Sequence, residues 1–222
     1  YLFKILKKNR DIRILMYHRI NDNFHKDRLC VKTDEFRKQM QFLYENGYEV
    51  ITLEQVYSLL SIVNGQNVNY KRIAITFDDG FEDNYKNAYP ILKEYGFPAT
   101  IFLSVNSIGK KDFLNWNQIS EMSKNGISLG SHTLTHAELT TISQDEAKNE
   151  IIHSKKQIES KGIRCDYFCY PKGDFNQNIK DLIRIAGFKA ACSIKPGANS
   201  FGHDLFELKR TEISGFDSLF DF

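Results

Sequence analysis

The sequence of 222 residues lacks the features that mark several classes of protein. No stretch approaches the roughly 18 consecutive apolar residues of a membrane-spanning helix. Neither sign of charge dominates, because 30 Lys and Arg residues stand against 28 Asp and Glu residues and leave a net charge of +2. Such a balance does not indicate a nucleic-acid partner, although a weak preference for anionic polymers stays open. Linkers, low-complexity segments and internal repeats are also missing.

Cysteine is scarce, with four residues at Cys30, Cys165, Cys169 and Cys192. Their spacing does not match a zinc ribbon. Cys165 and Cys169 lie in an apolar stretch typical of a strand, which favours buried free thiols, with a disulfide as the alternative.

The beginning of the chain lacks a signal peptide, because Tyr1–Arg10 is short and basic throughout. Since the chain starts at Tyr1 rather than Met, we expect a processed or trimmed form. Whether a leader or membrane anchor was removed is not visible in this sequence.

Short apolar runs alternate with segments of helical periodicity along the chain. The expected strands are Ile12–Tyr17, Val50–Ile51, Ile73–Phe77, Ala99–Val105, Ile127–Leu129, Tyr167–Tyr170, Phe188–Cys192 and a last stretch in Leu205–Ile213. The expected helices begin near Thr33, Thr52, Tyr85, Asn117, Ser143 and Asn178. This order predicts an α/β fold with a mostly parallel sheet covered by helices, which seven or eight such units can close into a barrel. We expect residues 1–222 to form one domain.

Polar residues follow the ends of several expected strands. They are His18, Asp78, Asp79, His132, Tyr170 and Pro171. Because parallel strands place their carboxyl ends on one face, where barrel active sites lie, these residues are expected to converge.

Two of these clusters suggest metal chemistry. Asp78 and Asp79 follow a strand and precede Gly80, so a sharp turn can aim the two carboxylates in different directions. His132 and His136 are spaced i, i+4, which on a helical turn puts both imidazoles on one face. Asp-Asp-Gly alone is typical of a turn, and a lone His-x-x-x-His of a helix surface or core. Together, each after a strand, they favour a metal site.

Two imidazoles and one carboxylate form a three-ligand set that leaves zinc an open position for water, and the same set suits iron, cobalt or nickel. A bound metal lowers the pKa of water from 15.7 toward about 7, and the second aspartate can take the proton. A separate acid must then protonate the leaving amine. This set of groups predicts hydrolysis of an amide or an ester.

At this point the residues resemble a known family, the NodB-homology polysaccharide deacetylases (carbohydrate esterase family 4). Thr76-Phe77-Asp78-Asp79-Gly80 is similar to the first motif of that family, and Ser131-His132-Thr133-Leu134-Thr135-His136 to the second. The resemblance spans roughly Ile12 to Ile213. It implies a distorted, NodB-like (β/α) barrel of about seven strands that removes N-acetyl groups from N-acetylglucosamine-type sugars.

The resemblance also implies roles for individual residues. Asp78 corresponds to the general base, and Asp79, His132 and His136 to the ligands of one divalent metal, foremost zinc. A third motif, lining the substrate groove, corresponds to the segment Tyr170-Pro171-Lys172-Gly173, and this segment departs from the family pattern. Phe168 stands where the family usually has an arginine. The residue that orients the base is therefore left open.

A second departure is the missing closing motif, because Leu205–Phe222 contains no histidine. At the other end, Leu15-Met16-Tyr17-His18 has the same character, an apolar strand that ends in histidine. This arrangement resembles the circularly permuted branch that acts on poly-β-1,6-N-acetylglucosamine in biofilm matrix. His18 then becomes the candidate general acid, the alternative being that it caps a strand or binds substrate.

Two further residues are candidates for the substrate site. Arg210 either tethers Asp78 or pairs on the surface. Trp116 either packs in the core or forms a stacking wall for a sugar ring.

The expected partner is an N-acetylated glycan of the cell envelope or matrix, which implies a location outside the cytoplasm. The alternatives are a catalytically weak glycan-binding protein of the same fold and an O-acetyl esterase. A phosphatase or nuclease is disfavoured, because Phe77-Asp78-Asp79-Gly80-Phe81 lacks the further Asp or Lys that those enzymes place after the first acid.

Overall fold

The computed structural model describes residues 11–23, 27–61, 71–219 and 222. Within these ranges, a curled sheet has the strand order β10-β1-β5-β6-β7-β8-β9, with β4 paired beside β5, and every pair is parallel. The strands are β1 (Arg13–Tyr17), β4 (Glu49–Val50), β5 (Arg72–Phe77), β6 (Ala99–Leu103), β7 (Ile127–Ser131), β8 (Tyr167–Cys169), β9 (Ala190–Cys192) and β10 (Thr211–Glu212). The predicted distorted (β/α) barrel is confirmed.

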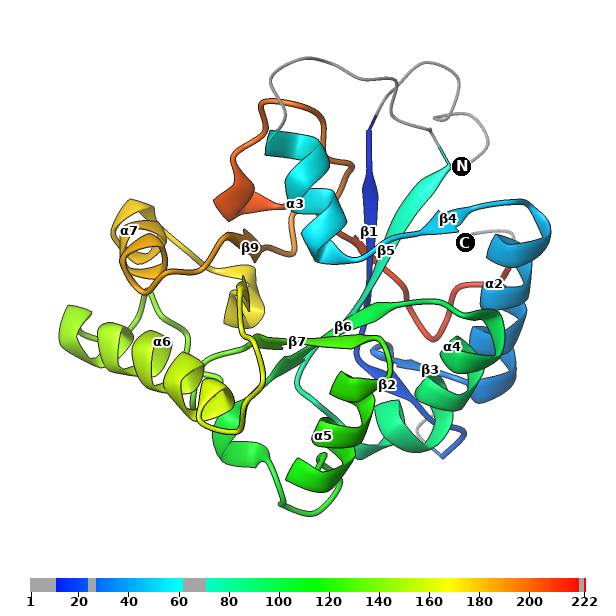
Figure 1. The fold of residues 1–222 in the computed structure, drawn as a ribbon, viewed down its shortest axis with the longest axis horizontal. Coiled ribbons are helices and arrows are strands. Elements are labelled where there is room, and N and C mark those ends of the chain that lie inside the picture. The colour runs from blue at the N-terminus through cyan, green and yellow to red at the C-terminus, as the bar shows by residue number, and fades with distance from the viewer. Residues whose placement is uncertain (1–10, 24–26, 62–70, 220–221) are drawn as a thin grey trace.

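Helices connect successive strands and lie in an arc around the sheet (Figure 1). They are α2 (Thr33–Glu45), α3 (Leu53–Ser61), α4 (Tyr89–Tyr95), α5 (Trp116–Lys124), α6 (Gln144–Glu159) and α7 (Gln177–Ile185). A capping box begins α6 where a helix start near Ser143 is expected, because the Ser143 hydroxyl accepts from the Glu146 N–H while the Glu146 carboxylate accepts from the Ser143 N–H.

One short segment links the two edges of the curled sheet. Leu208 forms a parallel bridge with Cys192 of β9, and Thr211 of β10 pairs with Leu15 of β1. The chain thus crosses from one edge strand to the other within four residues. This path places Arg210, which lies between the two contacts, at the seam of the barrel.

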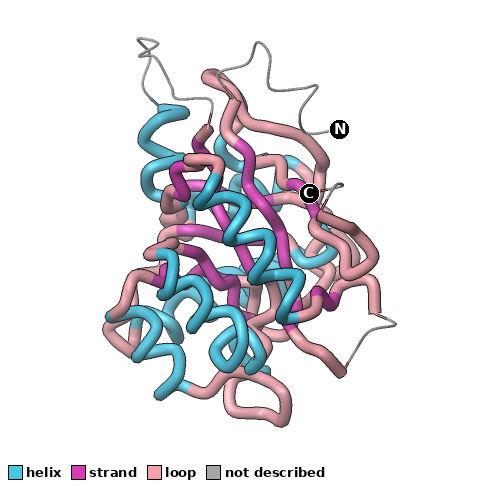
Figure 2. Tube along the Cα trace, turned by 90° about the vertical axis from the view of Figure 1, so that its right-hand side faces the viewer, coloured by secondary structure: helices cyan, strands magenta, loops and turns pink. Residues whose placement is uncertain are grey.

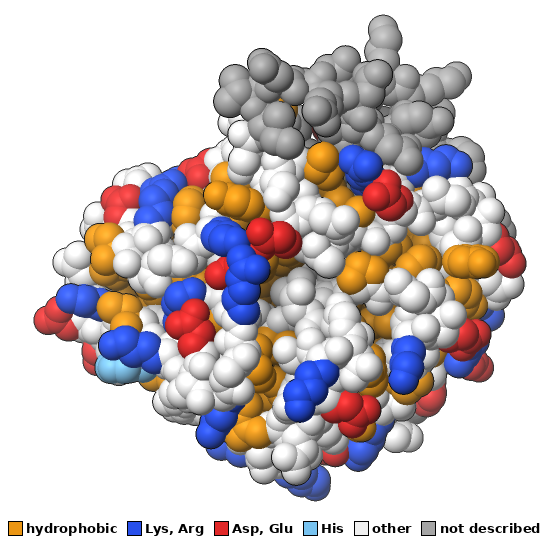
Figure 3. All heavy atoms as spheres, in the orientation of Figure 1, with side chains coloured by type: hydrophobic (Ala, Val, Ile, Leu, Met, Phe, Trp, Pro, Cys, Tyr) orange, Lys and Arg blue, Asp and Glu red, His pale blue; other side chains and the backbone are white. Residues whose placement is uncertain are grey.

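The core has two apolar clusters, because side chains alternate along each strand. Leu15 and Tyr17 of β1 face the layer beneath α2, α4, α5, α6 and α7, whereas Ile14 faces the interior that α3 covers. In the side view the strands run between helices and long loops (Figure 2). On the face seen in Figure 3, acidic and basic side chains are interspersed, as the small net charge predicts. Among the described residues, no helix is both long and apolar enough to cross a bilayer.

Three local expectations were wrong or incomplete. Within Leu205–Ile213, a 3-10 helix (η4, Leu205–Glu207) precedes the two residues of β10, because the Asp204 carboxylate accepts from the Phe206 N–H and begins a helical turn. The expected helix at Tyr85–Tyr95 is a π-helical turn (η1, Asn84–Ala88) followed by α4. Two strands of two residues each, β2 (Arg19–Ile20) and β3 (Cys30–Val31), form a separate small sheet that the sequence did not predict.

Candidate metal centre and active site

The two adjacent aspartates point into different surroundings. Asp79 and Gly80 both adopt left-handed backbone conformations, with φ of 71° and 76°. A β-carbon at Gly80 would lie 2.9 Å from a methyl carbon of Leu103, so both the conformation and the close approach require glycine. The turn therefore separates the Asp78 side chain, which is buried, from that of Asp79, which is 20% exposed.

Asp79, His132 and His136 converge as the sequence predicts. The Asp79 Oδ1 atom lies 3.5 Å from His132 Nε2 and 3.3 Å from His136 Nε2. One ligand atom from each residue falls within 4.8 Å of the others. His132 is buried whereas the side chain of His136 is 36% exposed, so the group lies at the edge of the interior with one side toward solvent.

The histidines do not lie on a helical turn, and that expectation is corrected. They belong to a loop after β7 in which Thr133 and His136 have φ of 66° and 63°. The two rings meet edge to face, with centroids 4.7 Å apart. His132 Nδ1 lies 2.8 Å from the Cys169 carbonyl oxygen, which can only accept, so Nδ1 carries the hydrogen and Nε2 presents a lone pair toward Asp79.

The electrostatics of this group suit a divalent cation. Burial lowers the pKa of His132 to about 4, and it also lowers the pKa of His136, so both imidazoles are neutral near pH 7. Burial, followed by the charge of Asp78, raises the pKa of Asp79 to about 6. Two neutral nitrogens and one carboxylate, to which no described lysine or arginine is bonded, form a donor set that fits zinc and related metals.

Asp78 is held by Arg210. Two guanidinium nitrogens donate to its two oxygens at 2.7 Å each, and Arg210 is 1% exposed. The guanidinium also donates to Thr76 Oγ1 at 3.2 Å, to the Ser193 carbonyl at 2.9 Å and to Cys169 Sγ at 3.0 Å. Burial alone would raise the pKa of Asp78, but the charge and hydrogen bonds of Arg210 outweigh it and hold that pKa below its usual range.

Of the two alternatives for Arg210, the structure shows the tether to Asp78 rather than a surface ion pair. All three of its nitrogens are engaged inside the protein, so we no longer assign Arg210 to direct substrate contact. Asp78, His132 and Cys169 also have ligand atoms within 4.8 Å of one another. Because Arg210 already occupies both Asp78 oxygens and contacts the Cys169 sulfur, its positive charge disfavours a cation there.

His18 follows β1 at the level of Asp78. Tyr17 pairs in register with Phe77, and the Asp78 N–H donates to the Tyr17 carbonyl at 2.9 Å. His18 lies close enough to Asp78 and Asp79 to interact electrostatically with both carboxylates. Its Nδ1 atom is buried and has no hydrogen-bond partner among the described residues. His18 therefore lies beside Asp78 and Asp79, and its chemical role stays a prediction.

The segment after β8 differs from an open groove wall. Tyr170 is fully buried, and its hydroxyl donates to the Phe206 carbonyl at 2.9 Å, so its side chain packs inside. Pro171 is buried as well, whereas Lys172 is exposed and its Nζ lies 2.9 Å from Glu138 Oε2. Of these three residues, only Lys172 is placed to meet a glycan from solvent.

Phe168 and Trp116 lie in apolar surroundings. Phe168, at the position of the family's usual arginine, is fully buried in the core. Trp116 is half-buried at the start of α5 and packs against the same core, with Lys161 Nζ 5.4 Å from its ring centroid. Core packing accounts for these contacts, and the stacking role of Trp116 stays a prediction.

All four cysteines are buried free thiols, which was the favoured alternative. The contact of Cys169 with the Asp78–Arg210 pair was not predicted. The sequence holds no signal for it, because the three residues come from β8, the end of β5 and the segment before β10.

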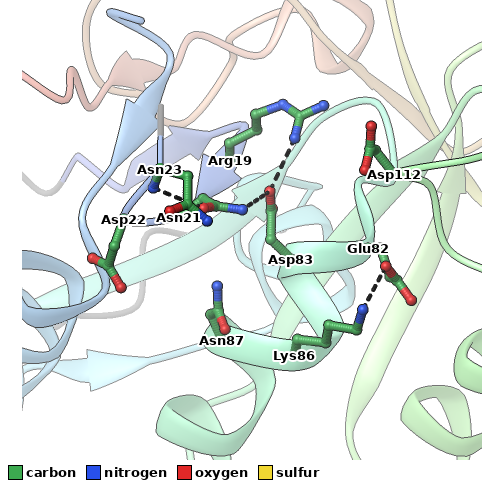
Figure 4. Close-up of a pocket in the computed structure, with 9 residues that line it drawn as sticks. All are labelled: Arg19, Asn21, Asp22, Asn23, Glu82, Asp83, Lys86, Asn87 and Asp112. Carbon is green, nitrogen blue, oxygen red and sulfur yellow. Dashed lines mark hydrogen bonds and ion pairs between the residues drawn. The ribbon is translucent and has the colours of Figure 1, made fainter. Parts of the chain in front are cut away.

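A polar pocket of about 380 Å³ is lined by residues that follow His18 and Asp79 in the sequence (Figure 4). Most of its walls are formed by the segments that come after β1 and β5. The lining residues are Arg19, Asn21, Asp22, Asn23, Glu82, Asp83, Lys86, Asn87 and Asp112. The centre is Asp83, which accepts hydrogen bonds from Arg19 at 3.2 Å and Asn21 at 3.4 Å. Such a lining suits the hydroxyl and amide groups of a sugar.

Comparison with known proteins gives a consistent result. A family model described as polysaccharide deacetylase matches residues 65–191. The Bacillus subtilis (strain 168) protein YxkH, which is named as a polysaccharide deacetylase, is 34% identical over 209 residues. The match covers 94% of this chain and 73% of that protein. A poly-beta-1,6-N-acetyl-D-glucosamine N-deacetylase of Staphylococcus aureus is 29% identical over 203 residues, covering 83% of this chain and 68% of its own.

A solved structure agrees over nearly the whole length. The Streptococcus pyogenes deacetylase PplD in complex with acetate superposes with a TM-score of 0.88 at 30% identity. The match covers 95% of this chain and 96% of that one. The fold and the arrangement of elements therefore extend beyond the part that the family model matches.

Proposed function

This chain belongs to the polysaccharide deacetylase family, and we propose that it removes N-acetyl groups from a polysaccharide that contains N-acetylglucosamine. Members of this family are hydrolases that act on carbon–nitrogen bonds other than peptide bonds. The observation that carries the proposal is the convergence of Asp79, His132 and His136 beside an ionised Asp78. The proposed ligands and the proposed base all follow the carboxyl ends of parallel strands.

In the proposed mechanism, Asp79, His132 and His136 hold one divalent cation, foremost zinc. When bound, such an ion supplies Lewis acidity that acidifies water and polarises the acetyl carbonyl. The chain's own contribution begins with His132, whose Nδ1–H bond to the Cys169 carbonyl fixes the ring so that Nε2 faces Asp79.

Asp78 accepts the proton from the attacking water. Arg210 keeps this carboxylate ionised and fixes the orientation of both oxygens through its two 2.7 Å hydrogen bonds. A base must lie within hydrogen-bond reach of the proton that it takes. The rigid pairing with Arg210 holds Asp78 in one position relative to its neighbour Asp79.

His18 donates the proton that the leaving amine needs. Its place after β1, beside the carboxylates of Asp78 and Asp79, supports this role. The amide nitrogen leaves with that proton as the free amine of glucosamine, and the acetyl group leaves as acetate.

The proposed substrate is poly-β-1,6-N-acetylglucosamine or another envelope glycan, met outside the cytoplasm. The name of the Staphylococcus aureus relative supports this choice. Sugars next to the reacting one lie along the polar pocket around Asp83. A catalytically weak glycan-binding protein is the alternative suggested by the missing arginine and histidine motifs, but Arg210 and His18 supply those groups from other parts of the chain.

The direct test is release of acetate from N-acetylglucosamine oligomers by zinc-loaded protein. We expect turnover on β-1,6-linked oligomers, less on β-1,4-linked oligomers, and loss of turnover in D78N. Release only from O-acetylated sugars would favour the esterase alternative. Saturable oligomer binding by the loaded protein without acetate release from any glycan would favour the binding protein and contradict the proposal.

A further inference from the structure

The loop that carries the two histidines has a shape that its own residues do not favour. Thr133 and His136 adopt left-handed conformations, with φ of 66° and 63°, which residues other than glycine rarely adopt. Its carbonyls are held from one side, because the Val105 and Asn106 N–H groups donate to the carbonyls of Thr133 and Leu134 at 3.1 and 2.8 Å. The N–H groups of Leu134 and Thr135 have a different partner.

Helix α6 meets those N–H groups with a buried carboxylate. Glu150 is 9% exposed and lies in the middle of α6. Its Oε2 accepts from the backbone N–H groups of Leu134 and Thr135, each at 2.9 Å, and its Oε1 accepts from the Thr135 hydroxyl at 2.8 Å. One side chain therefore satisfies two consecutive backbone donors between the two candidate metal ligands.

The same face of α6 also holds the start of the loop. Ser154 lies one helical turn after Glu150, and its hydroxyl is 2.6 Å from the Ser131 hydroxyl. The Ser131 oxygen in turn accepts from the Thr133 N–H at 3.2 Å. The helix thus contacts the loop at two points, before and between the histidines.

We infer that Glu150 is a positioning residue for the metal centre: it keeps the loop in the shape that aims His132 and His136 at Asp79. Without this acceptor, the buried N–H group of Leu134 and the partly buried N–H group of Thr135 lose their partner. The peptide units then rotate to find others, and His136 moves relative to His132. The inference rests on the proposed metal-dependent function, and it assigns to Glu150 no contact with metal or substrate.

The test measures metal affinity rather than activity. Apo protein is titrated with Zn²⁺ in competition with a chelating dye, and the Co²⁺-loaded protein is followed by its visible absorption spectrum. We expect E150A to raise the dissociation constant for Zn²⁺ by about 10–100-fold, the range typical of lost partners of metal ligands, and to alter the Co²⁺ spectrum.

Two conservative variants separate geometry from charge. In E150Q the amide oxygen can accept both backbone N–H groups while the amide nitrogen donates to the Thr135 hydroxyl, so affinity should stay within about threefold of wild type. E150D keeps the charge on a side chain one carbon shorter, and its affinity should fall below that of E150Q. E150D carries the test if E150A does not fold.

A matched control comes from the next residue of α6. Ile151 is fully buried but faces the core, so I151V lowers stability without touching the loop and should leave Zn²⁺ affinity unchanged. Wild-type affinity in E150A, equal loss in I151V, or better binding by E150D than by E150Q would overturn the inference. A wild-type protein that binds neither ion would instead contradict the proposed metal dependence itself.

Discussion

Two halves of the candidate site begin at adjacent residues but differ in how their polar groups are satisfied. The clamp, Asp78 with Arg210, is buried, and each carboxylate oxygen of Asp78 accepts a hydrogen bond from the guanidinium. The metal triad, Asp79 with His132 and His136, brings a carboxylate and two nitrogen lone pairs together with no lysine or arginine bonded to Asp79 among the described residues.

The difference shows how one dipeptide can serve two functions. The left-handed backbone at Asp79 turns its side chain away from the clamp, so Arg210 neutralises only Asp78. Burial, followed by the charge of Asp78, instead raises the pKa of Asp79 to about 6, so Asp79 is the carboxylate for which a proton and a divalent cation compete.

The largest expected effect comes from breaking the clamp at its carboxylate. D78N removes the base, and kcat for acetate release should fall by about 10²–10⁴-fold, the usual contribution of a general base. The metal triad is untouched, so the Zn²⁺-dependent rise in melting temperature should persist. Steady-state assays and thermal melts measure the two. A variant that retains turnover would show that Asp78 is not the base.

Breaking the clamp at its cation should affect stability most. R210M leaves the Asp78 carboxylate buried and unpaired, which should lower the free energy of unfolding by about 3–5 kcal/mol at pH 7. The depressed pKa of Asp78 in the wild type stabilises the fold above the unfolded value near 4, and this stabilisation is lost as the pH falls through the folded value.

In R210M the pKa of Asp78 should instead lie above its unfolded value, so that variant gains relative stability as the pH falls. The difference in the free energy of unfolding between the wild type and R210M should therefore decrease from pH 7 to pH 4. Urea unfolding at a series of pH values measures this difference. A gap that stays constant over this range would mean that the pair contributes packing rather than charge.

His18 belongs to neither the clamp nor the triad, and its buried Nδ1 has no hydrogen-bond partner among the described residues. H18Q should lower kcat by roughly 10²-fold, the lower part of the range for a general acid, and leave Zn²⁺ affinity unchanged. Initial rates over a range of substrate concentrations separate the alternatives. A rise in KM with unchanged kcat would assign His18 to substrate binding instead.

The smallest effect is expected in the polar pocket, outside both halves. Asp112 lines it, is exposed, and has φ of 68°, which glycine adopts without strain. D112G should raise KM for a long oligomer by about two- to fivefold, the loss of one hydrogen bond of about 1 kcal/mol, with kcat unchanged. A monosaccharide substrate is the control, and an equal change there would place the effect at the reacting sugar.

Much of the triad could be predicted from local sequence. Asp79, His132 and His136 follow strand ends, and parallel strands bring such ends together whatever the loops do. The shape of the histidine loop could not be predicted in this way. An i, i+4 spacing favours a helical turn, but left-handed residues and contacts from α6 and the turn after β6 impose another conformation.

The pairing of Asp78 with Arg210 in the clamp was harder to predict from the sequence. Arg210 and Asp78 are separated by 132 positions, and nothing local distinguishes a buried arginine from a surface one. The crossing from β9 to β10, through a segment whose 3-10 turn was itself unexpected, brings the guanidinium to Asp78, the proposed base. Long-range closure of the barrel, rather than any motif, therefore supplies the group that stands in for the missing arginine.

The most direct test compares Zn²⁺ binding to D78N and D79N by calorimetric titration. Asparagine tolerates the left-handed conformation of Asp79, so both substitutions change one carboxylate without straining the backbone. We expect the wild type and D78N to bind one ion per chain with similar affinity, and D79N to bind at least about 100-fold more weakly. Equal affinity in D79N and the wild type, or equal loss in both variants, would contradict the division of roles between the two aspartates.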